Sequence, residues 1–436
     1  MLIGSWAVLS LTALLIAEVN LRCHEQAVRQ APTDGSDPNR VIPLPEMTRM
    51  TLGATGEAGV SAIYLTLTFT LLLAYTARAG GLIDAALPFS TPVGTALFTG
   101  AIGGTLALTG TGGAERMNSA LTVGMLVLFA GVVAGGALQV DWNSSLAHAD
   151  WSVAAPCLPV MFLALVYHDL IPVVCQFLGF DRTKVTQSLL SGSVLPLGMF
   201  VAWEAVCLGL VPFSGDTGLD PVDVLIESQG ALGGSAIAAF SLAALATSAI
   251  GVTLSLSSFF KNKLSEMTTL GEIGGAQSAS ATPGGHVPSV LECTALLLTL
   301  MPPTIASMGN TDVFLPATHV AGAYGMTLLY GLLPPLLAWR WRGNAHAGER
   351  QQLLAGGKPV LLGLVGAGAA VEVLQLRRDL ADSSTSSAAF LEQQPVYEVA
   401  VAADAALSSV SATAASWSDA ALSLPVAVSA APFLPL

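Results

Sequence analysis

Long apolar stretches that contain almost no charged residues constrain this chain more than any other feature. Asp, Glu, Lys and Arg together make up only 10% of its 436 residues, while the apolar class reaches 53%. A soluble globular chain carries about 25% charged residues, so most of this surface is not built to face water. We therefore expect one membrane domain in place of the two or three soluble domains that the length alone would suggest.

A helix needs about 20 mostly apolar residues to cross the hydrocarbon core of a bilayer. Ten stretches meet this requirement: Leu2–Val19, Val60–Ala77, Pro92–Gly110, Ala120–Leu138, Cys157–Leu178, Leu189–Val211, Ala236–Phe260, Val290–Ser307, Phe314–Trp339 and Pro359–Leu376. None of them alternates apolar and polar residues as a membrane-spanning strand would. The sequence therefore predicts an all-α polytopic membrane protein with about ten transmembrane helices.

The lysines and arginines predict how these spans are oriented. Most of the 16 basic residues fall in the connections after the odd-numbered spans, and acidic residues fill the opposite connections. Because basic connections mark the cytoplasmic side, Arg182–Lys184 and Arg340–Lys358 should lie there and Asp216–Glu227 on the other face. The Asn143-Ser-Ser sequence would then be a glycosylation acceptor if the outer face meets the secretory lumen.

Three stretches outside the predicted spans look soluble: Arg22–Met50, Ser265–Pro288 and Asp379–Leu436. The last is rich in Ala and Ser with scattered acids, and such a composition does not favour a packed fold. We therefore divide the chain into a transmembrane domain, residues 1–378, and a disordered tail, residues 379–436.

Several functional classes find no support in the sequence. The net charge is −13 and the basic residues do not cluster, so the sequence has no basic surface of the kind that binds nucleic acid. The five cysteines show no spacing typical of a metal site, and neither a metal nor another cofactor is expected. The chain also lacks the HExxH, GxSxG and phosphate-loop motifs, so an enzyme is not expected.

The fifth predicted span holds the most informative polar cluster. Tyr167, His168 and Asp169 fall near its middle, and Pro172 follows them. A proline inside a helix leaves the carbonyl four residues earlier unbonded, here that of His168, and it biases Ile171 away from helical angles. Transporters bind solutes at such broken helices near the bilayer centre. The alternative is a proline-kinked helix whose polar residues only bond to neighbouring helices.

Other polar residues inside the spans are weaker candidates. Glu204 in the sixth span could carry a proton as a buried carboxyl, or could face water near the helix end. Thr247, Gly251 and Ser255 share one face of the seventh span, where small residues usually permit close packing but hydroxyls could also ligate a cation. Arg78 ends the second span, either as an interfacial anchor or as a partner for an anionic solute. Glu18, Glu292 and Glu372 lie close to helix ends and are interpreted as structural.

With these spans in order, the chain resembles the tryptophan/tyrosine permeases, also called hydroxy/aromatic amino-acid permeases, from Met1 to about Arg378. The likeness lies in the order and spacing of several segments along the spans. These are Leu158-Pro-Val-Met-Phe162 followed by Tyr167-His168 and Pro172, Ala244-Leu-Ala-Thr-Ser248 with Gly251-Val252, Leu300-Met-Pro-Pro303, Leu333-Pro-Pro-Leu-Leu-Ala-Trp339 and Gly356-Gly-Lys-Pro359.

The resemblance implies a LeuT-like inverted repeat of five plus five helices, followed by an eleventh, in which the broken first and sixth helices hold the substrate. On this pattern Leu2–Val19 corresponds to the second helix and Cys157–Leu178 to the sixth. The family's Gly-rich first helix then has no counterpart. The charge pattern points the same way, because it places Met1 on the outer face with no basic flank, and Leu2–Val19 lacks the features of a signal peptide.

The resemblance also implies roles for single residues. Phe162, Val166, Tyr167 and His168 would face the substrate from the sixth helix, with Tyr75 facing the same cavity, and we add Asp169 for its charge. Thr247 and Ser248 would lie where related carriers hold a coupling cation, and Glu204 is the candidate proton carrier. The chain departs from the family at three positions: Asp169 replaces a small residue, Glu204 a neutral amide and Arg78 a glycine. These charges favour a substrate range that need not be that of the family.

We therefore predict a multi-pass integral membrane protein that transports amino acids by alternating access. Proton-coupled symport of tyrosine or tryptophan is favoured, with Na⁺ as the other possible coupling ion. The alternative is a transport-inactive receptor, partner subunit or truncated product, and on the missing-helix hypothesis the chain as written would transport nothing. A plasma membrane and an organelle envelope would give the same pattern, and no feature indicates an oligomeric state.

Overall fold

A computed structural model describes residues 1–34, 40–140, 142, 157–210, 230–271, 289–309, 313–343 and 352–385. These residues form helices and contain no strands. The helices are α1 (Leu2–Asp34), α2 (Leu44–Ala86), α3 (Thr91–Ala137), α5 (Leu158–Leu165), the 3-10 turn η2 (His168–Leu170), α6 (Ile171–Phe177), α7 (Arg182–Leu210), α9 (Gly230–Gly271), α10 (Val290–Gly309), α11 (Phe314–Val320), the π-helix η4 (Ala321–Leu332), α12 (Leu333–Gly343) and α13 (Gly357–Thr385).

Nine helices among the described residues are long and apolar enough to cross a membrane, with α5–α6 and α11–α12 each counted once. The predicted all-α polytopic architecture is confirmed. The difference between nine helices and ten predicted spans comes from α3, which contains both Pro92–Gly110 and most of Ala120–Leu138.

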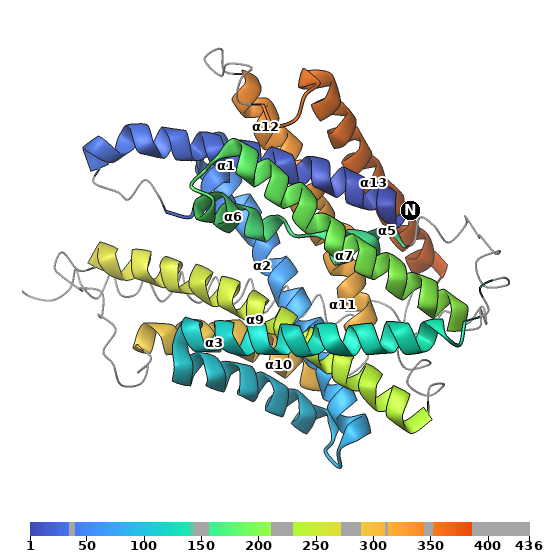
Figure 1. Ribbon diagram of the computed structural model, residues 1–436. Helices are drawn as coiled ribbons and strands as arrows, with labels where there is room; N and C mark the ends of the chain where they lie inside the picture. The colour runs from blue at the N-terminus through green and yellow to red at the C-terminus, as the bar shows by residue number, and fades with distance from the viewer. Residues whose placement is uncertain are drawn as a thin grey trace, which may run out of the picture.

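The α3 segment folds back on itself at Gly110. This glycine has φ 65° and ψ −169°, a backbone conformation that L side chains rarely adopt. The Thr105 hydroxyl lies 3.6 Å from the Met117 sulfur, whereas residues this far apart in a straight helix would be separated by roughly 18 Å. Figure 1 accordingly shows α3 as two teal rods joined at one end. The two rods correspond to the third and fourth predicted spans.

The helices are arranged around α2, which crosses the middle of the molecule (Figure 1). α3, α9 and α10 pack on one side of α2, while α1, α7, α12 and α13 lie on the other. α1, α2 and the α11–α12 run are largely buried, whereas few residues of α3, α7 and α13 are buried and several of their large apolar side chains are exposed. Exposed apolar faces of this extent suit helices that contact lipid.

Some helices run further than the apolar stretches that predicted them. α1 continues to Asp34 and α2 begins at Leu44, so Arg22–Met50 is more helical than expected. The extension of α1 is packed: Cys23 is fully buried and the His24 ring stacks on Phe180 at 3.5 Å. α9 similarly extends to Gly271, and α13 extends to Thr385, past the boundary predicted at Arg378. Residues 272–288 and 386–436, and the Asn143-Ser-Ser sequence, lie outside the described residues.

Two local features bear on the site. The Asp181 carboxylate accepts hydrogen bonds from the backbone N–H groups of Thr183 (2.9 Å) and Lys184 (3.0 Å), which is how an acid caps the first turn of a helix, here α7. These bonds, of which that from Lys184 has the larger effect, lower the pKa of Asp181 below its usual value of 3.8.

The second feature is η4, whose 12 residues form a π-helix within the predicted span Phe314–Trp339. π-helical turns are rare and are frequent at functional sites.

Candidate functional site

The predicted break in the fifth span is present. α5 ends at Leu165, and Val166 (φ −73°, ψ 134°) and Tyr167 (φ −140°, ψ 15°) leave the helical conformation before η2 and α6 resume it. Val166 and Tyr167 pack partly buried against the main hydrophobic core. Phe162, one turn earlier on α5, lines an apolar cavity of about 280 Å³ between α1, α5, η4 and α13.

The break is not where Pro172 was expected to put it. The backbone N–H of Ile171 bonds to the His168 carbonyl, and Pro172 lies in the first turn of α6, where a missing N–H costs nothing. Ile171 takes helical angles (φ −57°, ψ −45°), against the bias expected before a proline. It is fully buried, and this packing outweighs the local preference. Pro172 therefore lies in the first turn of the second half of the broken helix. The break itself is at Val166 and Tyr167, before η2.

His168 is buried and bonded to α1. Its Nε2 lies 2.9 Å from the Thr12 hydroxyl oxygen, and that hydroxyl donates its one proton to the Leu9 carbonyl at 3.0 Å. When the hydroxyl donates to Leu9, Nε2 carries the hydrogen and Nδ1 is an acceptor; the other tautomer reverses these roles. Within the described part of the chain, neither Nδ1 of His168 nor the hydroxyl of Tyr167 has a hydrogen-bond partner, although both are buried. Two adjacent residues at the break thus carry unsatisfied polar atoms.

Asp169 connects the break to η4 and α2. Its carboxylate accepts a hydrogen bond from the hydroxyl of Tyr330, which is 1% exposed. The Tyr330 ring lies 5.0 Å from the His168 ring, so the same tyrosine contacts both polar residues. Tyr64 of α2 lies near Asp169, and its side chain is close to that of Ser255 of α9. Tyr64 and Tyr330 were not singled out from the sequence, because a tyrosine in an apolar span gives no local sign of its partner.

The other predicted site residues form a second group. The side chain of Tyr75 of α2 lies close to that of Ser248 of α9, and the Thr247 hydroxyl donates to the Ala244 carbonyl at 3.0 Å. Tyr75 follows Tyr64 by eleven residues, roughly 16 Å along a helix. No hydrogen bond or ring contact in the described segments links it to the break. Glu204 is exposed on α7 beside Trp203 and takes no part in either group.

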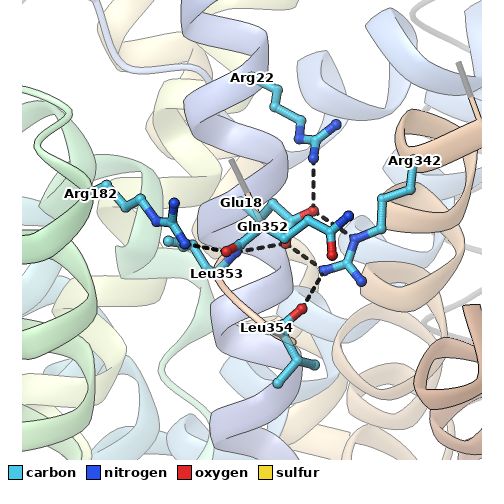
Figure 2. A network of polar contacts seen from close by, with 7 residues as sticks. All are labelled: Glu18, Arg22, Arg182, Arg342, Gln352, Leu353 and Leu354. Atoms are coloured by element: carbon cyan, nitrogen blue, oxygen red, sulfur yellow. Dashed lines mark hydrogen bonds and ion pairs between the residues drawn. The ribbon is translucent and has the colours of Figure 1, made fainter. Parts of the chain in front are cut away.

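A third polar network surrounds Glu18, which the sequence suggested was an ordinary helix-end residue. Its carboxylate is fully buried on α1 and accepts bonds from Arg22, Arg342 and the backbone N–H of Leu353 (Figure 2). Arg342 also donates to the Leu354 carbonyl at 3.0 Å, and Arg182 donates to that of Gln352. The network joins α1, α7 and α12 through residues 352–354. Its sequence signal was the pair Glu18 and Arg22, spaced four apart on one helix face.

A bundle of apolar helices, one of them broken at a buried polar cluster, defines a multi-pass integral membrane protein of the permease type. The family model for the tryptophan/tyrosine permease family matches residues 1–375, and the chain belongs to that family. This family consists of transport proteins, so the expectation that the chain is not an enzyme is supported.

The chain is also similar to three curated proteins. "Tyrosine-specific transport system 1" of Haemophilus influenzae is 26% identical over 378 residues, 84% of this chain and 85% of the relative. "Tyrosine-specific transport system 2" of the same organism is 24% identical over 363 residues, 78% and 80% of the two chains. "Tryptophan-specific transport protein" of Pseudomonas aeruginosa is 26% identical over 222 residues, 48% and 49% of the two chains. These relatives support amino-acid transport as the general activity.

Proposed function

We propose that this protein carries an aromatic amino acid, tyrosine or tryptophan, across a membrane by alternating access, as a proton symporter. The names of its relatives support the substrate class. The observation that carries the proposal is the break between α5 and α6. There Tyr167 and His168, beside the carboxylate of Asp169, hold buried polar atoms that have no hydrogen-bond partner among the described residues.

The chemistry of this cluster suits a zwitterion. Each unsatisfied buried polar group costs about 1–3 kcal/mol, and a ligand that bonds to it recovers that free energy. The Nδ1 acceptor of His168 and the carboxylate of Asp169 would receive the ammonium group of the substrate. The Tyr167 hydroxyl, with backbone N–H groups of the broken helix, would donate to its carboxylate.

Asp169 is also the carboxyl best placed to exchange the coupling proton. It lies at the break, and its hydrogen bond with Tyr330 joins it to η4, so a change in its charge would alter this contact. A proton on Asp169 would weaken this bond, because a neutral carboxyl is a poorer acceptor than a carboxylate. Glu204 is the second candidate for proton transfer. If Na⁺ is the coupling ion instead, the hydroxyls of Thr247 and Ser248 are its proposed ligands.

Uptake of radiolabelled tyrosine and tryptophan by the full-length protein in liposomes tests the proposal. Asp169→Asn and His168→Ala should lower uptake at least about tenfold, since each removes a charge-assisted or buried hydrogen bond to the substrate. Glu115→Gln is the matched control, because Glu115 is an exposed carboxylate on α3 far along the chain from the break. Wild-type uptake by both site variants would reject this site.

A second measurement separates the coupling ions. An inward proton gradient without Na⁺ should drive accumulation, and Asp169→Asn should abolish that accumulation. Uptake that requires Na⁺ and fails in Thr247→Ala or Ser248→Ala would reject proton symport in favour of Na⁺ coupling.

A further inference from the structure

The Glu18 network holds more buried positive charge than negative charge. Its centre consists of one carboxylate, that of Glu18, and the guanidinium groups of Arg22 and Arg342, whose side chains are 4% and 3% exposed. Arg182, which reaches the network through the Gln352 carbonyl, is exposed to solvent. Two buried cations beside one buried anion leave an excess of one positive charge, and buried charges are normally paired.

The hydrogen bonds of the two guanidinium groups are also incomplete. Arg22 bonds to Glu18 only through Nη2, and Arg342 bonds to Glu18 and to the Leu354 carbonyl through Nε and Nη2. Nε and Nη1 of Arg22 and Nη1 of Arg342 are buried, and they have no hydrogen-bond partner among the described residues. Arginine nitrogens donate and never accept, so these atoms require acceptors.

The two guanidinium groups flank a single carboxylate oxygen. Nη2 of Arg22 lies 3.3 Å from Oε1 of Glu18, and Nε of Arg342 lies 2.8 Å from the same atom (Figure 2). Like charges held this close repel each other, most strongly where water is excluded. Glu25 is within electrostatic reach of Arg22, but it is only half-buried and does not bond to the buried Nε and Nη1 atoms.

Burial limits what can bind there. The segment 352–354 packs over the network: the backbone N–H of Leu353 bonds to Glu18 at 3.0 Å, and the Leu354 carbonyl accepts from Arg342 at 3.0 Å. A water molecule would satisfy the N–H groups but is neutral, so it would leave the excess charge in place. A small anion satisfies the N–H groups and removes the excess charge as well.

We propose that Arg22 and Arg342 bind a small monovalent anion, represented by chloride. The anion accepts hydrogen bonds from unpartnered N–H groups of the two side chains, and with Glu18 it brings the buried charge of the network to zero. The site lies where α1 and α12 leave the membrane, on the face that the charge pattern makes cytoplasmic. It is separate from the break, and its existence does not depend on the substrate.

Thermal unfolding of the full-length protein in detergent tests the proposal. Chloride is replaced stepwise by gluconate, a bulky monovalent anion, so that the ionic strength stays constant. A ligand that binds only the folded protein raises Tm with its concentration, so Tm should rise saturably with chloride. Bromide and nitrate should act like chloride. A Tm that is the same in chloride and in gluconate would overturn the proposal.

Substitutions of Arg22 assign this effect to the network. Arg22→Met removes the excess charge and leaves Glu18 and Arg342 as a neutral pair, so the Tm of this variant should not respond to chloride. Arg22→Lys keeps the charge and should retain part of the response. Arg49→Met is the matched control, because Arg49 is 64% exposed and pairs with Glu57 at 3.7 Å. A response of wild-type size in Arg22→Met would overturn the proposal.

Direct binding provides a measurement that does not depend on any variant. Radiolabelled chloride should bind to the wild-type protein at one saturable site per chain, and excess bromide, but not gluconate, should displace it. Absence of saturable binding would overturn the proposal.

A lipid phosphate is the other source of an anion. Phosphatidylglycerol added to delipidated protein in gluconate should not replace chloride, because the site is buried. If this lipid raises the Tm of wild type but not that of Arg22→Met, while chloride has no effect, the network binds a lipid headgroup and the small-anion site is rejected.

Discussion

Glu18 and Arg342, 324 residues apart in the chain, form a buried two-point ion pair. Arg342 donates from Nε to Oε1 at 2.8 Å and from Nη2 to Oε2 at 2.6 Å, and neither side chain is more than 3% exposed. Arg22 approaches the same carboxylate at 3.3 Å. One carboxylate therefore neutralises parts of two buried guanidinium groups, and the segment 352–354 closes over it.

Removing this carboxylate should lower the free energy of unfolding. Glu18→Ala leaves Arg22 and Arg342 buried without their anion, and breaking a buried pair in this way costs about 3–5 kcal/mol. Thermal unfolding in detergent should show the loss as a large fall in Tm. Glu46→Ala is the control, because the Arg40–Glu46 pair is half-exposed and such pairs contribute about 0–1 kcal/mol. Similar Tm values for the two variants would mean that the Glu18 network is not a structural anchor.

The spans and the break could be predicted because their causes are local. Twenty apolar residues in a row identify a membrane helix by length alone. A polar triplet followed by Pro172 marks a weak point in a helix without knowledge of its neighbours. Even so, the predicted position of the break was wrong. Pro172 lies in the first turn of α6, and the helical conformation is interrupted earlier, at Val166 and Tyr167.

The partners of the site could not be predicted, because they come from distant parts of the chain. Tyr330 reaches Asp169 across 161 residues, and nothing around Tyr330 distinguishes it from a tyrosine packed in a core. Glu18 looked like a residue at a helix end because α1 was expected to stop near Val19. Since α1 continues to Asp34, the same position falls inside the bundle.

The fold-back of α3 makes a prediction about topology. Ser90→Cys and Gln139→Cys, introduced one at a time after replacement of the five native cysteines, should react with an impermeant maleimide from the same side of the membrane. Gly112→Cys should react from the opposite side, and the open space around Gly112 should accommodate the new side chain. Labelling of all three positions from one side would contradict the two crossings that a break at Gly110 implies.

The cap on α7 predicts a dependence of stability on pH. The pKa of Asp181 is lowered in the folded state by the backbone N–H groups of Lys184 and Thr183. Its contribution to stability is therefore fully present above the ordinary value of 3.8 and is lost as pH falls through the lower folded-state pKa. The Tm difference between wild type and Asp181→Ala should be largest near neutral pH and should shrink below pH 3.8. A difference that does not change with pH would rule out the charged cap.

Two Tyr–Asp hydrogen bonds among the described residues give a matched test of the site. Tyr330 donates to Asp169 at the break, while Tyr324, also on η4, donates to Asp379 at the end of α13. Tyr330→Phe and Tyr324→Phe each remove one hydroxyl and keep the ring, so each should cost about 1.5–3 kcal/mol for a bond to a charged group.

Only one of the two variants should impair transport. Tyr330→Phe leaves Asp169 without its donor and removes the connection between the break and η4, so uptake of labelled tyrosine should fall at least about tenfold. Tyr324→Phe should keep uptake near wild type at equal expression, because Asp379 retains a 3.0 Å bond from Gln375 and lies outside the site. Uptake and Tm measured together separate the two effects. Equal loss of uptake in both variants would show that Tyr330 acts through stability alone.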